Sequence, residues 1–245
     1  MKRTLHLSTA IAWGFVCHGV FALAIVAMFL GVRSGMEFGF GTLHGPFALV
    51  ANAALVLQFP LLHSFLLGTR GRKVLESCAP RAIARELAPT VFATVAGLPV
   101  LLTFIAWSPS GSVLARPTGA AAWLCDAFYV GAWLLLVRSI HDAGVANQTG
   151  FVGWSSVVRR KPLDFGPFPT HGLFRLCRQP VYFAYSVMLW AAPVRTPDGL
   201  WLAAGWSAYC LIGPLLKERR YLRWFGEAYE TYRRRTPYFV PRIRS

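Results

Sequence analysis

Several windows of this 245-residue chain are predominantly apolar over about 20 residues, the length at which a helix crosses roughly 30 Å of hydrocarbon. Candidate spans lie at residues 9–31, 46–67, 88–107 and 119–137, and a longer apolar stretch covers 181–216. Only 14% of the residues are charged, well below the roughly 25% of a soluble domain. The sequence predicts an all-α polytopic membrane bundle with five to six membrane segments, including a C-terminal helical hairpin followed by a cytoplasmic helix.

The positive charges alternate from loop to loop. Lys and Arg number two before the first span, five in residues 68–87, six in 138–180 and nine from Lys217 onward, but one each in 32–45 and 108–118. Because cytoplasmic loops carry the excess of Lys and Arg, we expect both termini in the cytoplasm. The formal net charge of +15 then reflects basic loops facing the anionic lipid bilayer, and nucleic acid is not an expected partner.

The apolar stretch 181–216 must enter the membrane and return if the long loop before it and the tail after it are both cytoplasmic. The residues from Pro193 to Gly199 include two prolines, an aspartate and a glycine, which are typical of turns. We expect the hairpin to turn there. Each arm would have about 13 to 19 residues, so one or both would fall short of a full crossing.

Motifs of soluble enzymes are missing from the sequence, which contains no P-loop, no G-x-S-x-G and no H-E-x-x-H. The five cysteines form no C-x-x-C pair, so no metal site is predicted. His18 and His63 fall in apolar spans, where a polar group is a functional candidate. Hydrogen bonding between helices is the more common role of a single such histidine.

Two polar and aromatic clusters flank the long apolar stretch. The first runs from His171 to Tyr182 and the second from Lys217 to Pro237. A hairpin would bring both to one cytoplasmic face, where guanidinium groups can hold a carboxylate and aromatic faces a cation. With Glu218 as counter-charge, such a pocket favours a zwitterionic sulfonium ligand. The alternative is an interfacial belt of aromatics and snorkelling arginines.

The spacing within the clusters resembles the C-terminal region of the isoprenylcysteine carboxyl methyltransferase superfamily. The chain reads G-x-F-R-x-x-R-Q-P-x-Y and then K-E-R-x-x-L-x-x-F-G-x-x-Y-x-x-Y-x-x-R-x-P. The family pattern is G-x-Y-R-x-x-R-H-P-x-Y, then E-E-x-x-L and F-G-x-x-Y-x-x-Y-x-x-R-x-P. Upstream, Gln58 through His63 and Gly131-Ala132-Trp133 are similar to the branch of methanethiol S-methyltransferases and membrane proteins associated with nitric oxide reduction.

The resemblance implies N-terminal transmembrane helices over residues 1–137 and a methyltransferase-like region over 138–245, located in the bacterial inner membrane. It implies S-adenosylmethionine as cofactor and a small or lipophilic, methanethiol-like thiol as acceptor. By position, Tyr229, Tyr232 and Arg235 would support a cytoplasmic lid. The implied cofactor-binding residues are Phe168, Pro169, Thr170, His171, Gly172, Phe174, Arg178, Gln179, Pro180, Tyr182, Glu218, Tyr229 and Tyr232.

Two residues depart from the family pattern. Gln179 stands in place of the family histidine and cannot titrate near neutrality. Lys217 stands in place of the first glutamate and reverses the charge beside a sulfonium. The departures leave three interpretations: a different acceptor, Glu218 acting alone, or loss of catalysis. The candidate catalytic residues are His171, Arg178 and Gln179, and none is an obvious base for a thiol.

Two other functions stay open from the sequence alone. A sterol-type membrane reductase that binds a nicotinamide cofactor shares parts of the C-terminal architecture. A noncatalytic membrane partner of a redox or denitrification system is favoured by the two departures. The sequence does not indicate the oligomeric state.

Overall fold

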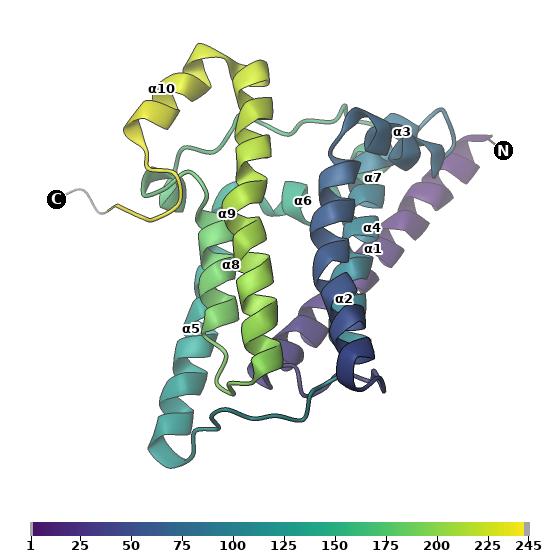
Figure 1. Ribbon diagram of the computed structural model, residues 1–245. Coiled ribbons are helices and arrows are strands. Elements are labelled where there is room, and N and C mark those ends of the chain that lie inside the picture. The colour runs from purple at the N-terminus through teal and green to yellow at the C-terminus, as the bar shows by residue number, and fades with distance from the viewer. Residues whose placement is uncertain (1, 243–245) are drawn as a thin grey trace. The chain divides into compact units, whose positions relative to one another are not determined.

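The computed structural model describes residues 2–242, and every secondary-structure element in that range is helical (Figure 1). The prediction of an all-α helical membrane bundle is confirmed. The elements in chain order are α1 (Lys2–Arg33), α2 (Gly45–Leu66), α3 (Thr69–Ser77), α4 (Ala84–Ile105), α5 (Gly119–Ala143), α6 (Val145–Gln148), α7 (Phe151–Arg159), the 3₁₀ helix η1 (Gly172–Arg175), α8 (Pro180–Trp190), α9 (Pro197–Phe225) and α10 (Glu227–Arg235).

Five of the described helices are long and apolar enough to cross a membrane: α1, α2, α4, α5 and α9. They match the four predicted spans and the second arm of the predicted hairpin. The first arm, α8, has 11 residues and covers only about 16 Å at 1.5 Å per residue, about half the hydrocarbon thickness. The sixth membrane segment is therefore a short helix that does not cross the bilayer.

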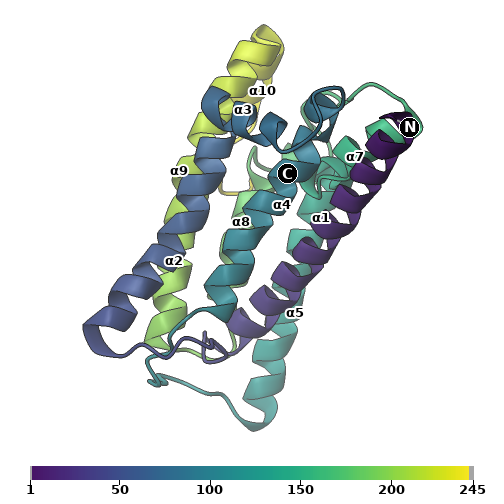
Figure 2. The same ribbon diagram turned by 90° about the vertical axis from the view of Figure 1, so that its right-hand side faces the viewer.

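The described residues form two compact units, and the first holds residues 2–31, 38–109 and 144–166. Within it α4 packs against α2, α3 and α7, and α3 lies across the connected ends of α2 and α4 (Figure 2). Ala10, Leu66, Leu87 and Val91 are buried in one apolar cluster. This unit therefore combines the long apolar helices α1, α2 and α4 with the short helices α3, α6 and α7.

The two intramembrane histidines lie in the first unit. His18 accepts a hydrogen bond from Trp154 Nε1 at 3.1 Å, so the expected role in helix packing is confirmed. His63 lies between the rings of Phe59 and Phe92, at centroid distances of 5.3 and 5.2 Å. Both imidazoles are thus in contact with aromatic side chains of their own unit.

The second unit holds residues 32–37, 110–143 and 167–242. Within it α8 packs between α5 and α9, and α10 folds back from the C-terminal end of α9 (Figure 1). Tyr129, Met188, Leu202 and Trp206 are buried in this three-helix packing. Both polar clusters identified in the sequence belong to this unit.

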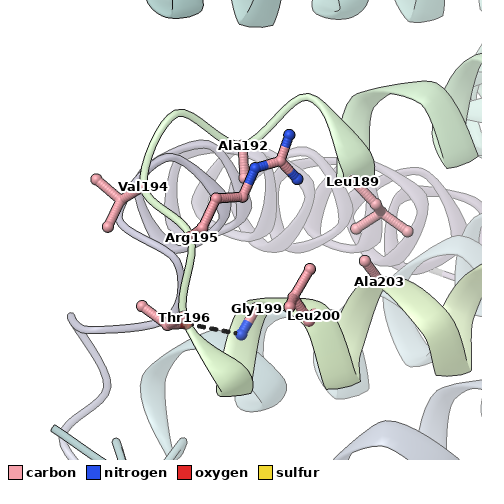
Figure 3. A pocket seen from close by; sticks show the side chains of 8 residues that line it. All are labelled: Leu189, Ala192, Val194, Arg195, Thr196, Gly199, Leu200 and Ala203. Atoms are coloured by element: carbon pink, nitrogen blue, oxygen red, sulfur yellow. Dashed lines mark hydrogen bonds between the residues drawn. The ribbon is translucent and has the colours of Figure 1, made fainter. Parts of the chain in front are cut away.

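The hairpin turn between α8 and α9 lies at residues 191–196 (Figure 3). The prediction that the turn extends from Pro193 to Gly199 is wrong at its end, because Pro197 is already the first residue of α9. Proline lacks an N–H and has a helical φ, so it fits that position well. The Thr196 hydroxyl accepts a hydrogen bond from the Gly199 amide at 2.9 Å and thereby caps the helix.

Helices also occupy two stretches that the hydropathy pattern predicts to be loops. The stretch 68–87 contains α3, and 138–180 contains the end of α5 as well as α6, α7 and η1. α3 and α7 have nine residues each, and helices so short escape a span-length hydropathy window. The functional division of the chain at residue 138 stays a prediction.

Candidate functional site

The two polar clusters meet beside the C-terminal half of α9. Arg178 Nε and Nη2 donate to the two carboxylate oxygens of Glu218 at 2.8 and 3.2 Å. The side chains are only 11% and 7% exposed. A bidentate arginine–carboxylate pair has a defined geometry, so it fixes the segment before α8 against α9.

Arg178 also holds the chain that follows α10. Its Nη1 donates to the carbonyl oxygens of Arg233 and Thr236 at 2.8 and 2.6 Å. Its backbone amide donates to the carbonyl oxygen of Pro237 at 2.9 Å. Each guanidinium nitrogen therefore has a protein acceptor. In this arrangement Arg178 positions α9 and α10 relative to each other, and a role as the ligand's carboxylate partner would require it to exchange these bonds.

The two residues that depart from the family pattern contact each other. Gln179 is 1% exposed, and its Nε2 donates to Glu218 Oε1 at 3.0 Å. Its Oε1 accepts a hydrogen bond from Lys217 Nζ at 3.3 Å. The side-chain amide of Gln179 thus links the two charged groups. Its NH₂ donates to the Glu218 carboxylate, and its oxygen accepts from the Lys217 ammonium.

Three aromatic rings surround the Lys217 ammonium, and we call them the aromatic cage. The centroids of Tyr221, Tyr182 and Phe174 lie 5.4, 5.7 and 6.0 Å from Nζ. These distances are within the range of cation–π attraction. The cage therefore has the geometry to hold a compact cation, here the Lys217 ammonium. Its rings come from η1, α8 and α9.

A small cavity adjoins the cage, with a volume of about 190 Å³ that includes its opening to solvent. Phe168 covers part of it, with its ring 5.2 and 5.6 Å from those of Tyr229 and Tyr232. Aromatic and cationic side chains dominate the walls of this cavity. Its lining residues are Phe168, Pro169, Phe174, Arg178, Lys217, Tyr221, Tyr229 and Tyr232.

Most of the predicted site residues come together here. Tyr182 joins through the cage, and Glu218 and Gln179 through their hydrogen bonds. Thr170 and His171 are exposed and do not line the cavity. The site assignments themselves stay predictions.

Asp142, at the end of α5, is a site residue that sequence reasoning missed. Its carboxylate is 3% exposed and accepts hydrogen bonds from the Leu173 amide at 2.9 Å and from Arg138 Nε at 3.2 Å. Gly172 has φ +54°, and a Cβ there would overlap the Asp142 carboxylate. The signal in the sequence was an Arg–Asp pair spaced i,i+4 at the end of a span.

Two tyrosines of α10 close the cavity. Tyr232 Oη donates to the Phe174 carbonyl at 2.7 Å, and Tyr229 is 2% exposed. Burial raises the pKa of both phenols, and the nearby Glu218 charge raises the pKa of each further. Both therefore stay protonated at neutral pH and can act as hydrogen-bond donors.

Known proteins align with nearly the whole chain. Methanethiol S-methyltransferase 2 of Bradyrhizobium diazoefficiens is 27% identical over 229 residues, which is 94% of this chain and 86% of that protein. Methanethiol S-methyltransferase 1 of the same organism is 27% identical over 203 residues, 81% of this chain and 68% of that protein. A methanethiol S-methyltransferase of Pseudomonas deceptionensis is 24% identical over 217 residues, 88% of this chain and 80% of that protein. Over most of its length, this chain is similar to proteins named methanethiol S-methyltransferase.

The similarity to the methanethiol S-methyltransferases extends well beyond residues 172–237, in which the motifs lie, because up to 229 residues align. It therefore includes transmembrane helices as well as the candidate site, and the resemblance to this branch is confirmed. No protein-family model matches the chain, and no solved structure is significantly similar to it.

Proposed function

We propose that this protein is an integral membrane methyltransferase that transfers the methyl group of S-adenosylmethionine to a small or lipophilic thiol. Five of its relatives, 24–27% identical to it, are named methanethiol S-methyltransferase. Five of the described helices are long and apolar enough to cross a membrane, and a lipophilic acceptor would dissolve in that bilayer. Methanethiol is the acceptor to test first.

The observation that carries the proposal is the aromatic cage beside the Arg178–Glu218 pair. When bound, S-adenosylmethionine supplies an electrophilic methyl group on a sulfonium, which is a compact cation like the ammonium that the cage holds here. The rings of Phe174, Tyr182 and Tyr221 would hold that cation. Phe168 and the tyrosines of α10 would shield the site from water.

Methyl transfer of this kind is an in-line displacement, so the protein contributes mainly alignment and a matching electrostatic environment. Glu218 provides negative charge near the cage, while Arg178 and Gln179 hold its carboxylate in place. Asp142 holds η1, which carries Phe174. These residues would position the sulfonium toward the acceptor thiol.

We further propose that the protein resides in the bacterial inner membrane with both termini in the cytoplasm. The support is the excess of Lys and Arg in alternate loops and in the tail. In this orientation the candidate site faces the cytoplasm, where the cofactor is available.

Calorimetry on the detergent-solubilised protein tests the proposal against its two alternatives. We expect S-adenosylhomocysteine to bind and a nicotinamide dinucleotide not to bind. The reverse result would identify a reductase, and binding of neither would favour a noncatalytic membrane partner, so either result would overturn the proposal.

Variants then locate the binding site. Tyr182→Ala removes one ring of the cage, and we expect it to weaken S-adenosylmethionine binding by about fivefold, since a cation–π contact contributes about 1 kcal/mol. The matched control is Phe128→Ala, which removes an aromatic ring that is 62% exposed on α5. Equal affinity in the two variants would remove the cage from the cofactor site.

A further inference from the structure

Lys217 and Gln179 replace two residues of the family pattern, and their side chains are hydrogen-bonded to each other. The Lys217 ammonium donates to Gln179 Oε1, and Gln179 Nε2 donates to Glu218 Oε1. Both oxygens of Glu218 also accept from Arg178. The carboxylate is therefore hydrogen-bonded to Arg178 and Gln179. The Lys217 ammonium contacts the aromatic cage and Gln179, and the nearby Glu218 charge favours it only through space.

The groups that face the Lys217 amine come from every element around it. The charged groups are Glu218 and Arg220 on α9 and Arg178 across the cavity. The other titratable groups are phenols on three helices. They are Tyr182 on α8, Tyr221 on α9, and Tyr229 and Tyr232 on α10.

The cage that holds the ammonium is also where the proposed function places the sulfonium. Two positive charges in one cage repel, and a like charge favours the neutral form of an amine. A neutral Lys217 keeps an N–H for Gln179 Oε1 and gains a free lone pair beside the cavity. That lone pair can accept the proton of a thiol.

We infer that Lys217 is the base of the methyl-transfer reaction, and that binding of the sulfonium cofactor activates it by releasing its proton to solvent. The inference rests on the proposed function. In the step itself, Lys217 Nζ takes the thiol proton and the thiol sulfur forms the bond to the methyl carbon. The bond between that carbon and the sulfonium breaks, and its electron pair stays with the departing S-adenosylhomocysteine. Lys217 ends as an ammonium.

Proton release on binding tests the inference without turnover. Titration calorimetry is run with S-adenosylmethionine and with S-adenosylhomocysteine, each in phosphate and in Tris, whose ionisation enthalpies differ. The two ligands differ by one methyl group and one positive charge. We expect S-adenosylmethionine to release about one proton per site more than S-adenosylhomocysteine near neutral pH.

Three variants separate this role from a structural one. Lys217→Met should abolish the difference in proton release and bind S-adenosylmethionine about tenfold more tightly, because binding no longer requires an ammonium to lose its proton. Lys217→Arg keeps a charge that does not titrate, so it should bind S-adenosylmethionine more weakly than S-adenosylhomocysteine and release no extra proton. Arg219→Met removes an exposed neighbouring cation and should behave like the wild type.

The outcomes distinguish this inference from the proposed function. If both ligands bind the wild type with equal proton release, Lys217 is not the base, while the cofactor assignment stands. If neither ligand binds, the proposed function fails and the inference fails with it. Extra proton release that persists in Lys217→Arg would assign the proton to another group and would also overturn the inference.

Discussion

Glu218 is the residue on which the contacts of the candidate site converge. It accepts hydrogen bonds from Arg178 and Gln179 and lies next to Lys217 in the chain. Because the pair with Arg178 is nearly inaccessible to solvent, losing one partner leaves a buried charge without compensation. The site and the stability of its unit therefore depend on the same carboxylate.

Glu218→Gln should lower the stability of the protein by about 3 kcal/mol and weaken S-adenosylhomocysteine binding, because the Arg178 guanidinium loses its counter-charge. Thermal unfolding in detergent measures the first effect and calorimetry the second. Glu227→Gln, at an exposed carboxylate of α10, is the control. Melting temperatures that are equal in the two variants would contradict this account of the pair.

Gly172→Ala should destabilise the protein and weaken ligand binding, since alanine at φ +54° is strained and its Cβ would overlap the Asp142 carboxylate. Gly166→Ala separates the two causes, because Gly166 has φ +65° but open space around it. A left-handed alanine alone costs about 1–2 kcal/mol. If both variants unfold at the same temperature, Asp142 does not restrict the position.

At the scale of elements, the spans and the hairpin followed from hydropathy and loop charge because each depends on a run of about 20 residues. The end of the turn was misplaced because Pro197 can either sit in a turn or begin a helix. The contact of Asp142 with η1 joins residues 31 positions apart, and sequence spacing does not record such a contact. Lys217 was visible in the sequence only as a departure, because its cage forms from three separate elements.

Tyr238, in the segment after α10, should make the stability of the C-terminal region depend on pH. Burial and the nearby Glu218 charge raise the pKa of Tyr238 to about 12, and its hydroxyl donates to the Leu211 carbonyl at 2.6 Å. An unfolded tyrosine titrates near 10, so the folded state binds this proton more tightly. The stabilisation is complete below pH 10 and is lost as the pH rises through about 12.

Tyr238→Phe should therefore be less stable than the wild type at pH 8 but should lose less stability between pH 10 and 12. Melting temperatures of the two proteins across this range provide the comparison. Tyr209→Phe, which alters another tyrosine of the same unit, is the control. Parallel pH profiles for wild type and Tyr238→Phe would show that Tyr238 does not carry the effect.

At the scale of the whole molecule, the account requires residues 159–180 and 217–242 to face the same side of the membrane. Thr170→Cys and Glu227→Cys, both at exposed positions, should react with a membrane-impermeant maleimide in inside-out vesicles and not in intact cells. Ser112→Cys should show the opposite behaviour. The exposed Cys78 is replaced by serine in each case. Labelling of the first two from opposite sides would leave no shared site.

Transfer of a labelled methyl group tests the central claim most directly. Purified protein is incubated with methanethiol and S-adenosylmethionine that carries a trideuterated methyl group, and the headspace is analysed by mass spectrometry. The account predicts dimethyl sulfide with three deuterium atoms, formed by the wild type and by Glu227→Gln and greatly reduced in Glu218→Gln. Absence of labelled product from folded wild-type protein with methanethiol and with larger thiols alike would contradict it.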